Sequence, residues 1–114
     1  MTNRVYVPTT RTRLAEWHAA GVVPAETERV LASGDDEDGE YDALMTAAEL
    51  AVGLGPEDGR RVVVVAETED AAGEGSLPLR RWVAVHCDDA DRSADAAPDD
   101  DLAWFATQEI PDLL

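Results

Sequence analysis

The stretch Arg61-Val62-Val63-Val64-Val65-Ala66 is, with Trp82-Val83-Ala84-Val85-His86-Cys87, the most strand-like part of this 114-residue chain. Residues 62–65 are apolar on both faces, which is typical of a central strand covered on each side. The acidic segment 67–79 between the two stretches contains glycines and a proline and has no apolar periodicity, so a loop is predicted there. We therefore expect two antiparallel strands that anchor the core.

A strand and a helix are predicted before this core. Residues 4–8 alternate apolar and other side chains and end at a proline, as a short first strand does. Thr9 or Thr10 provides a helix N-cap, and Gly21 followed by Pro24 provides the stop. The apolar face of this helix would carry Leu14, Trp17 and His18.

Two further segments lie between this helix and the central strand. Residues 25–33 are ambiguous, because local propensity favours a helical turn whereas 27–31 equally suits an edge strand; the strand is favoured. The acidic run 35–40 precedes a clearer helix, which ends at Gly53, Gly55 and Pro56. Its predicted apolar stripe consists of Tyr41, Leu44, Met45, Ala48 and Val52.

The C-terminal segment 99–109 is predicted to be a helix. Leu102, Phe105 and Ala106 would face inward, and Pro111 would end it near residues 109–110. The complete order predicts an α+β fold, a mixed four-stranded sheet with about three packed helices; an α/β sandwich is the alternative. Since there is no long linker and no repeat, we expect a single domain over residues 1–114.

Charge restricts the expected partners. The chain has 25 acidic and nine basic residues, all nine of them arginine, and a formal net charge of −16. Such a surface repels nucleic acids and anionic membranes, whereas it attracts basic proteins or cations. No apolar run is long enough to span a membrane, and the N-terminus lacks a secretory signal pattern. Cys87 is the only cysteine, so a reducing, cytoplasmic location is expected.

Four blocks of sequence carry a resemblance to known proteins. They are Arg4-Val5-Tyr6-Val7-Pro8, Glu40-Tyr41-Asp42-Ala43-Leu44, Val83-Ala84-Val85-His86-Cys87-Asp88-Asp89 and Trp104-Phe105-Ala106-Thr107-Gln108-Glu109-Ile110-Pro111-Asp112-Leu113-Leu114. Together they resemble a family of short acidic actinobacterial proteins that has no assigned activity. The resemblance supports a strand near Thr27 and implies no catalytic residue.

The acidic runs invite comparison with a calcium loop. An EF-hand loop needs oxygen ligands at alternating positions around a central glycine. With Gly39 as that glycine, Gly34 and Met45 occupy ligand positions, and the second candidate, 89–95, has Ala94 in place of glycine. We therefore predict no metal site and no cofactor. The acids of 35–40 and 99–101 instead suit the starts of helices.

No catalytic residue is predicted. The run His86-Cys87-Asp88 invites comparison with a cysteine nucleophile, which needs a base within hydrogen-bond reach. Adjacent strand residues point to opposite faces, so His86 cannot readily activate Cys87, and a buried structural cysteine is expected. The arginine pairs Arg60-Arg61 and Arg80-Arg81 would lie at opposite ends of the sheet and pair with carboxylates at its rim.

One candidate interaction surface remains. Trp104 and Gln108 would turn away from the inward face of the last helix, and Asp88, Asp89 and Asp91 would follow the last strand in a solvated loop. Folding of the 110–114 tail back over Trp104 is the favoured alternative, since large aromatic side chains are mostly buried.

These observations lead to three hypotheses for function. The leading one is a non-enzymatic interaction module that binds a basic partner protein through its acidic surface. The second is a small enzyme or ligand-binding domain whose polar residues, among them His18, His86 or the arginine pairs, converge only in a three-dimensional pocket. The third is a DNA mimic that inhibits a nucleic-acid-binding protein.

Overall fold

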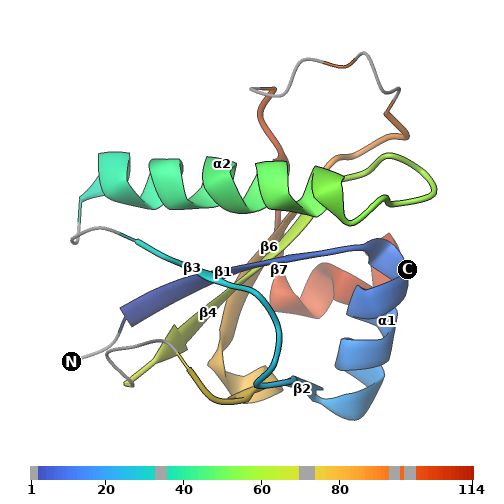
Figure 1. Ribbon diagram of the computed structural model, residues 1–114. Coiled ribbons are helices and arrows are strands. Elements are labelled where there is room, and N and C mark those ends of the chain that lie inside the picture. The colour runs from blue at the N-terminus through green and yellow to red at the C-terminus, as the bar shows by residue number, and fades with distance from the viewer. Residues whose placement is uncertain (1–2, 33–35, 70–73, 93–95, 97–99) are drawn as a thin grey trace.

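A five-stranded sheet organises the computed structural model, which describes residues 3–32, 36–69, 74–92, 96 and 100–114 (Figure 1). The strands are β1 (Asn3–Thr9), β3 (Val30–Leu31), β4 (Val62–Thr68), β6 (Trp82–Cys87) and β7 (Ala103–Ala106), in the spatial order β3-β1-β4-β6-β7. Every described pairing in this sheet is antiparallel. A second, two-stranded sheet joins β2 (Val22–Val23) to β5 (Leu77–Pro78).

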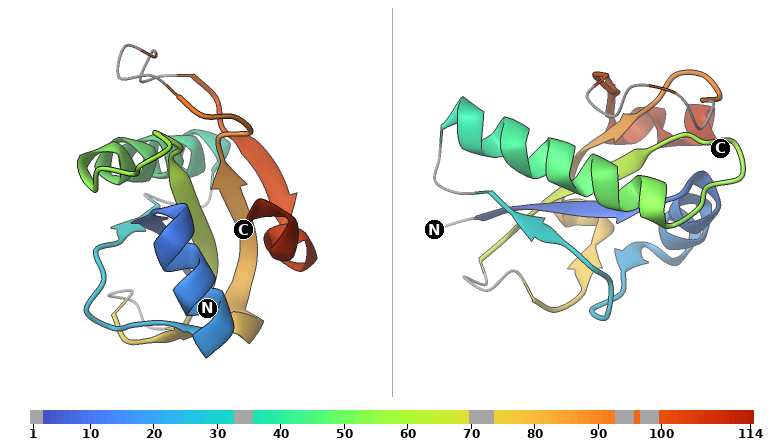
Figure 2. Two further views of the ribbon diagram at one scale, coloured as in Figure 1. Left: turned by 90° about the vertical axis from the view of Figure 1, so that its right-hand side faces the viewer. Right: turned by 45° about the horizontal axis from the view of Figure 1, so that its top comes forward.

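Helices cover the two faces of the main sheet. The long helix α2 (Glu37–Gly53) lies on one face, and α1 (Arg11–Ala20) lies on the other with the 3₁₀ helix η2 (Thr107–Leu113) (Figures 1 and 2). A single 3₁₀ turn, η1 (Leu79–Arg81), leads into β6. Successive side chains along β4 therefore point alternately into two cores, one on each face of the sheet.

The larger core lies under α1 and η2. On β4 it takes Val62, Val64 and Ala66, whose side chains alternate with those of Val63 and Val65 on the α2 face. The run of valines at 62–65 is thus buried on both faces, as its composition predicts. The predicted antiparallel pairing with β6 is confirmed.

The first helix has the predicted boundaries. The Thr10 side chain accepts a hydrogen bond from the backbone N–H of Arg13 at 3.2 Å and caps its start. Gly21 ends it with φ of +77°, and its N–H donates to the carbonyl of Trp17 at 2.8 Å. Since a side chain in this left-handed conformation is strained, glycine suits the position.

The second helix is present, but its buried face differs from the predicted stripe. Asp36 caps its N-terminus by accepting from the Gly39 N–H at 2.8 Å, and the acids that follow lie in its first turn, as predicted. Tyr41 and Val52 are exposed, however. Leu44 and Ala48 of the predicted stripe do pack toward the sheet, but the fully buried face consists of small residues: Ala43, Ala47, Ala48 and Ala51.

Two short strands modify the expected sheet. The favoured strand at 27–31 is present in part, as the two-residue strand β3 paired with β1. The segment 67–79, predicted to be a loop, contains β5, which pairs with β2 across the end of α1. Residues 70–73 of that segment lie outside the described part of the chain.

The C-terminal helix predicted over 99–109 is wrong. Residues 103–106 form β7, which pairs with β6, and η2 follows through Pro111 to Leu113. Leu102 packs in the core under α2, whereas Phe105 packs in the opposite core. Their spacing of three suits a helix face, but pairing with β6 places them on opposite faces of a sheet.

The α+β fold class is confirmed, but the main sheet has five strands rather than four, and its described pairings are all antiparallel rather than mixed. Its topology leaves β7 as one edge strand and β3 as the other. Within the described residues, no helix combines the length and apolar character needed to cross a membrane.

Candidate functional site

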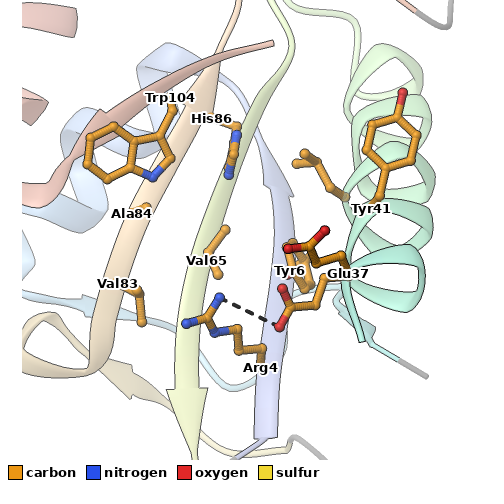
Figure 3. Close-up of a pocket in the computed structure, with 11 residues that line it drawn as sticks. Arg4, Tyr6, Glu37, Tyr41, Val65, Val83, Ala84, His86 and Trp104 are labelled. Carbon is orange, nitrogen blue, oxygen red and sulfur yellow. Dashed lines mark ion pairs between the residues drawn. The ribbon is translucent and has the colours of Figure 1, made fainter. Parts of the chain in front are cut away.

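A solvent-facing cleft of about 280 Å³ forms where the cover provided by α2 ends (Figure 3). Helix α2 packs on β3, β1 and β4, so the β6 and β7 side of this sheet face lies beside the helix rather than under it. The lining side chains come from α2 and four strands: Arg4, Tyr6, Glu37, Glu40, Tyr41, Leu44, Val65, Val83, Ala84, His86 and Trp104.

Strand register places the floor and one wall. Val65 of β4 is opposite Ala84 of β6, and these small apolar side chains form the floor with Val83. His86 of β6 is opposite Trp104 of β7, so both side chains stand on the same face at the far side (Figure 3). Because side chains alternate along a strand, the neighbours of Val65, His86 and Trp104 along β4, β6 and β7 face the core on the opposite side of the sheet.

Two exposed aromatic side chains flank the cleft. Trp104 is 60% exposed and Tyr41 of α2 is 49% exposed. The Tyr41 hydroxyl donates to Oδ1 of Asp101 at 3.3 Å, which connects the helix to the segment before β7. The prediction that the 110–114 tail covers Trp104 is therefore wrong: Ile110 and Leu113 are buried in the α1-side core instead.

Charged groups lie on the α2 side of the cleft. Arg4 Nη1 is 3.7 Å from Glu40 Oε1, and Glu37 points into the same space from the first turn of α2 (Figure 3). Burial raises the pKa of Tyr6, and the charge of Glu40 adds to this, against the opposing effect of Arg4. Tyr6 is therefore a neutral phenol at neutral pH.

His86 is the only histidine in the cleft lining. Burial lowers its pKa from 6.5, so the imidazole is neutral at pH 7. The His86 side chain forms no hydrogen bond with another described residue, and His18 lies on α1 beyond the opposite face. The imidazole thus contributes a neutral, partly apolar surface next to Trp104.

A second polar cluster joins the start of β4 to the end of β6. Arg61 is fully buried, and its Nε and Nη2 atoms donate to Asp88 Oδ2 and Oδ1 at 3.0 and 2.8 Å. The backbone N–H of Arg61 adds a bond to Oδ2 at 2.7 Å, and Arg92 Nη1 one to Oδ1 at 3.2 Å. The predictions of a solvated Asp88 and of Arg61 at the rim are therefore wrong.

The Asp88 carboxylate of this cluster is ionised at neutral pH. Burial acts to raise the pKa of Asp88, but hydrogen bonds from the side chain and backbone of Arg61 outweigh it, so the pKa lies below 3.8. The neighbouring acids Asp89 and Asp91 are exposed, and Asp91 Oδ1 accepts from Arg60 Nε at 3.1 Å. The arginine pairs 60–61 and 80–81 lie at opposite ends of the antiparallel strands, as predicted.

Cys87 is buried in the core on the α1 side. Its Sγ donates to the Asp88 carbonyl at 3.2 Å, and burial, followed by the charge of Asp88, raises the pKa of the thiol to about 11. A protonated, buried thiol is a poor nucleophile. The prediction that Cys87 is buried is confirmed, and the thiol lies on the sheet face opposite His86.

Sequence reasoning found one wall of the cleft and missed the other. Trp104, a candidate for an interaction surface, lines the cleft, whereas Gln108, the other candidate, is exposed on η2 outside the lining. Arg4 and Glu37 were not singled out, because only the packing of α2 on β1 brings them together. The described residues contain no group of three potential metal ligands; Asp35 and Asp95 lie outside them.

Comparison with known proteins gives a family and no activity. No curated protein matches the chain, and no solved structure does. A family model described as a family of unknown function (DUF6912) matches residues 3–114. Because the match covers nearly the whole sequence, the chain belongs to this family of unknown function.

Proposed function

We propose that the protein is a non-enzymatic interaction module that binds a basic segment of a partner protein in the cleft between α2 and β7. The observation that carries this proposal is the pairing of exposed aromatic rings with carboxylates on one concave surface. Trp104 and Tyr41 provide the rings, and Glu37 and Glu40 provide the negative charge.

Cation recognition follows from the chemistry of these groups. The face of an aromatic ring attracts a cation within about 6 Å of its centre, most strongly for tryptophan, and the attraction grows as water is excluded. A carboxylate nearby adds a charge-assisted hydrogen bond. A basic side chain over the Val65 and Ala84 floor would place its aliphatic part on apolar surface and its charge beside Glu37.

The rest of the molecule favours the same class of partner. A net charge of −16 attracts a basic protein over long distances and accelerates its encounter with the cleft. The cleft volume of about 280 Å³ is just below the roughly 300–1,000 Å³ of small-molecule pockets, so it suits one side chain of a larger partner.

A test is available in the three tryptophans. Trp17 and Trp82 are buried, whereas Trp104 is exposed in the cleft, so their indole N–H signals report on three separate environments. Titration of the ¹⁵N-labelled protein with an unstructured peptide of alternating glycine and basic residues, at low salt, should shift the Trp104 signal and leave the other two in place. A peptide with acidic residues in the same positions is the control.

Substitutions connect the signal to the cleft. Trp104→Ala should weaken binding of the basic peptide about 5- to 30-fold, the equivalent of about 1–2 kcal/mol. The control Val52→Ala removes an exposed apolar side chain on α2, outside the cleft, and should leave the affinity for the peptide unchanged. Undiminished binding by Trp104→Ala, or absence of any binding by the wild type at low salt, would contradict the proposal.

A second candidate function is a small ligand-binding domain, which the presence of His86 in the cleft favours. It predicts that a free cationic small molecule shifts the Trp104 indole N–H signal as strongly as the peptide does. The DNA-mimic hypothesis makes a different prediction, since inhibition of a nucleic-acid-binding protein through distributed carboxylates would survive Trp104→Ala. Trp104→Ala thus separates the DNA mimic from the two cleft-binding hypotheses, and the small-molecule titration separates those two from each other.

A further inference from the structure

We infer that the cleft selects arginine over lysine in the basic partner, and that Arg4 is the intramolecular guanidinium with which the partner's arginine competes. This inference rests on the proposed function and specifies its ligand.

The first observation is that the cleft already holds a guanidinium. Arg4 reaches into it from β1, beside Tyr6, with Nη1 3.7 Å from Glu40 Oε1 (Figure 3). The cleft therefore accommodates a planar guanidinium, with its five N–H donors, next to a carboxylate and an aromatic ring. The guanidinium of a partner's arginine would occupy the side of the cleft next to Trp104, which Arg4 does not fill.

The second observation is the shape of the two walls. Trp104 offers a broad, 60% exposed indole, and the Glu37 carboxylate forms no hydrogen bond or ion pair with another described residue. A guanidinium stacks its flat face on an indole while its edge donates two parallel hydrogen bonds to a carboxylate. The ammonium of lysine is compact and strongly hydrated, so it makes neither the stack nor the paired bonds.

The third observation is that Arg4 is held weakly. Its side chain is 42% exposed, and 3.7 Å is too long for a direct hydrogen bond to Glu40. Exposed ion pairs of this kind contribute little to stability, so Arg4 can leave Glu40 at small cost. While it remains in the cleft, however, its positive charge opposes the entry of a second cation.

The test compares two peptides that differ only in one central residue, arginine or lysine, with glycine and serine around it. Binding to the wild type, followed through the Trp104 indole signal, should be about fivefold tighter or more for the arginine peptide. Trp104→Ala lacks this signal, so its binding is followed by isothermal titration calorimetry, and it should lose most of the preference. Equal affinities would overturn arginine selectivity while leaving the proposed function intact, whereas failure of both peptides to bind would overturn both.

Matched variants test the role of Arg4. Arg4→Gln should tighten binding of the arginine peptide several-fold, because it removes both the competitor for Glu40 and a positive charge in the cleft. Arg13→Gln makes the same change of net charge on the exposed surface of α1, outside the cleft, and should tighten binding much less. Equal effects of the two substitutions would show that Arg4 does not compete in the cleft.

Glu37→Gln and Glu49→Gln form a second matched pair on α2. Both remove one negative charge, but Glu49 lies outside the cleft. Glu37→Gln should weaken binding of the arginine peptide by a larger factor and reduce the ratio between arginine and lysine peptides. A ratio unchanged by Glu37→Gln would contradict the paired hydrogen bonds on which the selectivity is argued.

Discussion

Single residues fix the geometry of this fold where its strands meet. Arg61 and Asp88 form a buried pair with four hydrogen bonds from Arg61 and Arg92 to one carboxylate. The remaining donor capacity of Arg61 goes partly to the Asp100 carbonyl at 2.8 Å, which attaches the segment before β7. Desolvation of the two charges is thus offset by well-directed bonds, and the pair sets the relative position of β4, β6 and β7.

Replacing Asp88 should be the most damaging change to a polar residue. Asp88→Ala leaves the Arg61 guanidinium buried without its counter-charge, and the expected loss is about 3–5 kcal/mol of unfolding free energy. Urea denaturation followed by tryptophan fluorescence measures it. The control Arg60→Gln removes only the pair with Asp91, whose side chain is 75% exposed, and should cost at most about 1 kcal/mol.

The same pair has a pH signature. Because the folded-state pKa of Asp88 lies below its unfolded value of 3.8, its contribution is complete above that value and disappears as the pH falls toward the folded-state pKa. Wild-type stability should therefore decrease more steeply below pH 4 than that of Asp88→Ala. Parallel pH profiles for the two proteins would show that the carboxylate carries no such role.

At the scale of elements, α2 approaches the sheet through alanines. Ala43, Ala47, Ala48 and Ala51 are buried, whereas the larger Tyr41 and Val52 face outward. Small side chains allow the helix to lie close to β1 and β4, and this position brings Glu37 and Glu40 to the edge of the cleft. The close packing of α2 is therefore part of the candidate site.

Ala47→Leu tests this packing. Ala47 is fully buried against the sheet, so the larger side chain must push the helix away or adopt a strained rotamer, at an expected cost of about 1–3 kcal/mol. Thr46→Leu adds a similar side chain at an exposed position one residue earlier and should change stability by no more than about 0.5 kcal/mol. Denaturant midpoints of the two variants give the comparison; equal midpoints would argue against close packing.

The elements also show what the sequence could predict. The valine run of β4, the caps at Thr10 and Gly21, and the strand β6 have strong local signals, and all were predicted correctly. The segment 103–106 was not, because its apolar spacing fits a helix and only pairing with β6 makes it a strand. A local sequence pattern reports on the propensity of its own segment, whereas the strand β7 forms only because the segment pairs with β6.

The candidate site follows the same rule. Trp104 was identifiable from its size and its place outside an apolar face, although the element that carries it was assigned incorrectly. The cleft itself joins residues 4–6, 37–44 and 83–104, which no periodicity connects. Asp88 was placed in solvent because a single aspartate after a strand gives no sign of a buried arginine 27 positions earlier.

At the scale of the whole molecule, the acidic surface and the two cores act in opposite directions. Apolar burial on both faces of β4 stabilises the fold, whereas like charges repel one another most when the chain is compact. The molecule has a radius of gyration of 13.0 Å. The Debye length of about 30 Å at 0.01 M salt is comparable with the molecule's extents of 39 × 31 × 23 Å, so most of the surface charges interact; at 0.1 M it is only about 10 Å, and distant charges are screened.

Stability should therefore rise with salt at neutral pH. We expect the urea midpoint of the wild type to increase between 0.01 and 0.1 M NaCl, because screening relieves the repulsion expected at a net charge of −16. A variant with Glu16, Glu49 and Glu57 replaced by glutamine removes three exposed charges and should have a higher midpoint at 0.01 M and a smaller response to salt. Binding of the basic peptide should weaken over the same range, since its attraction is screened too. A midpoint that falls with salt would mean that favourable ion pairs outweigh the repulsion.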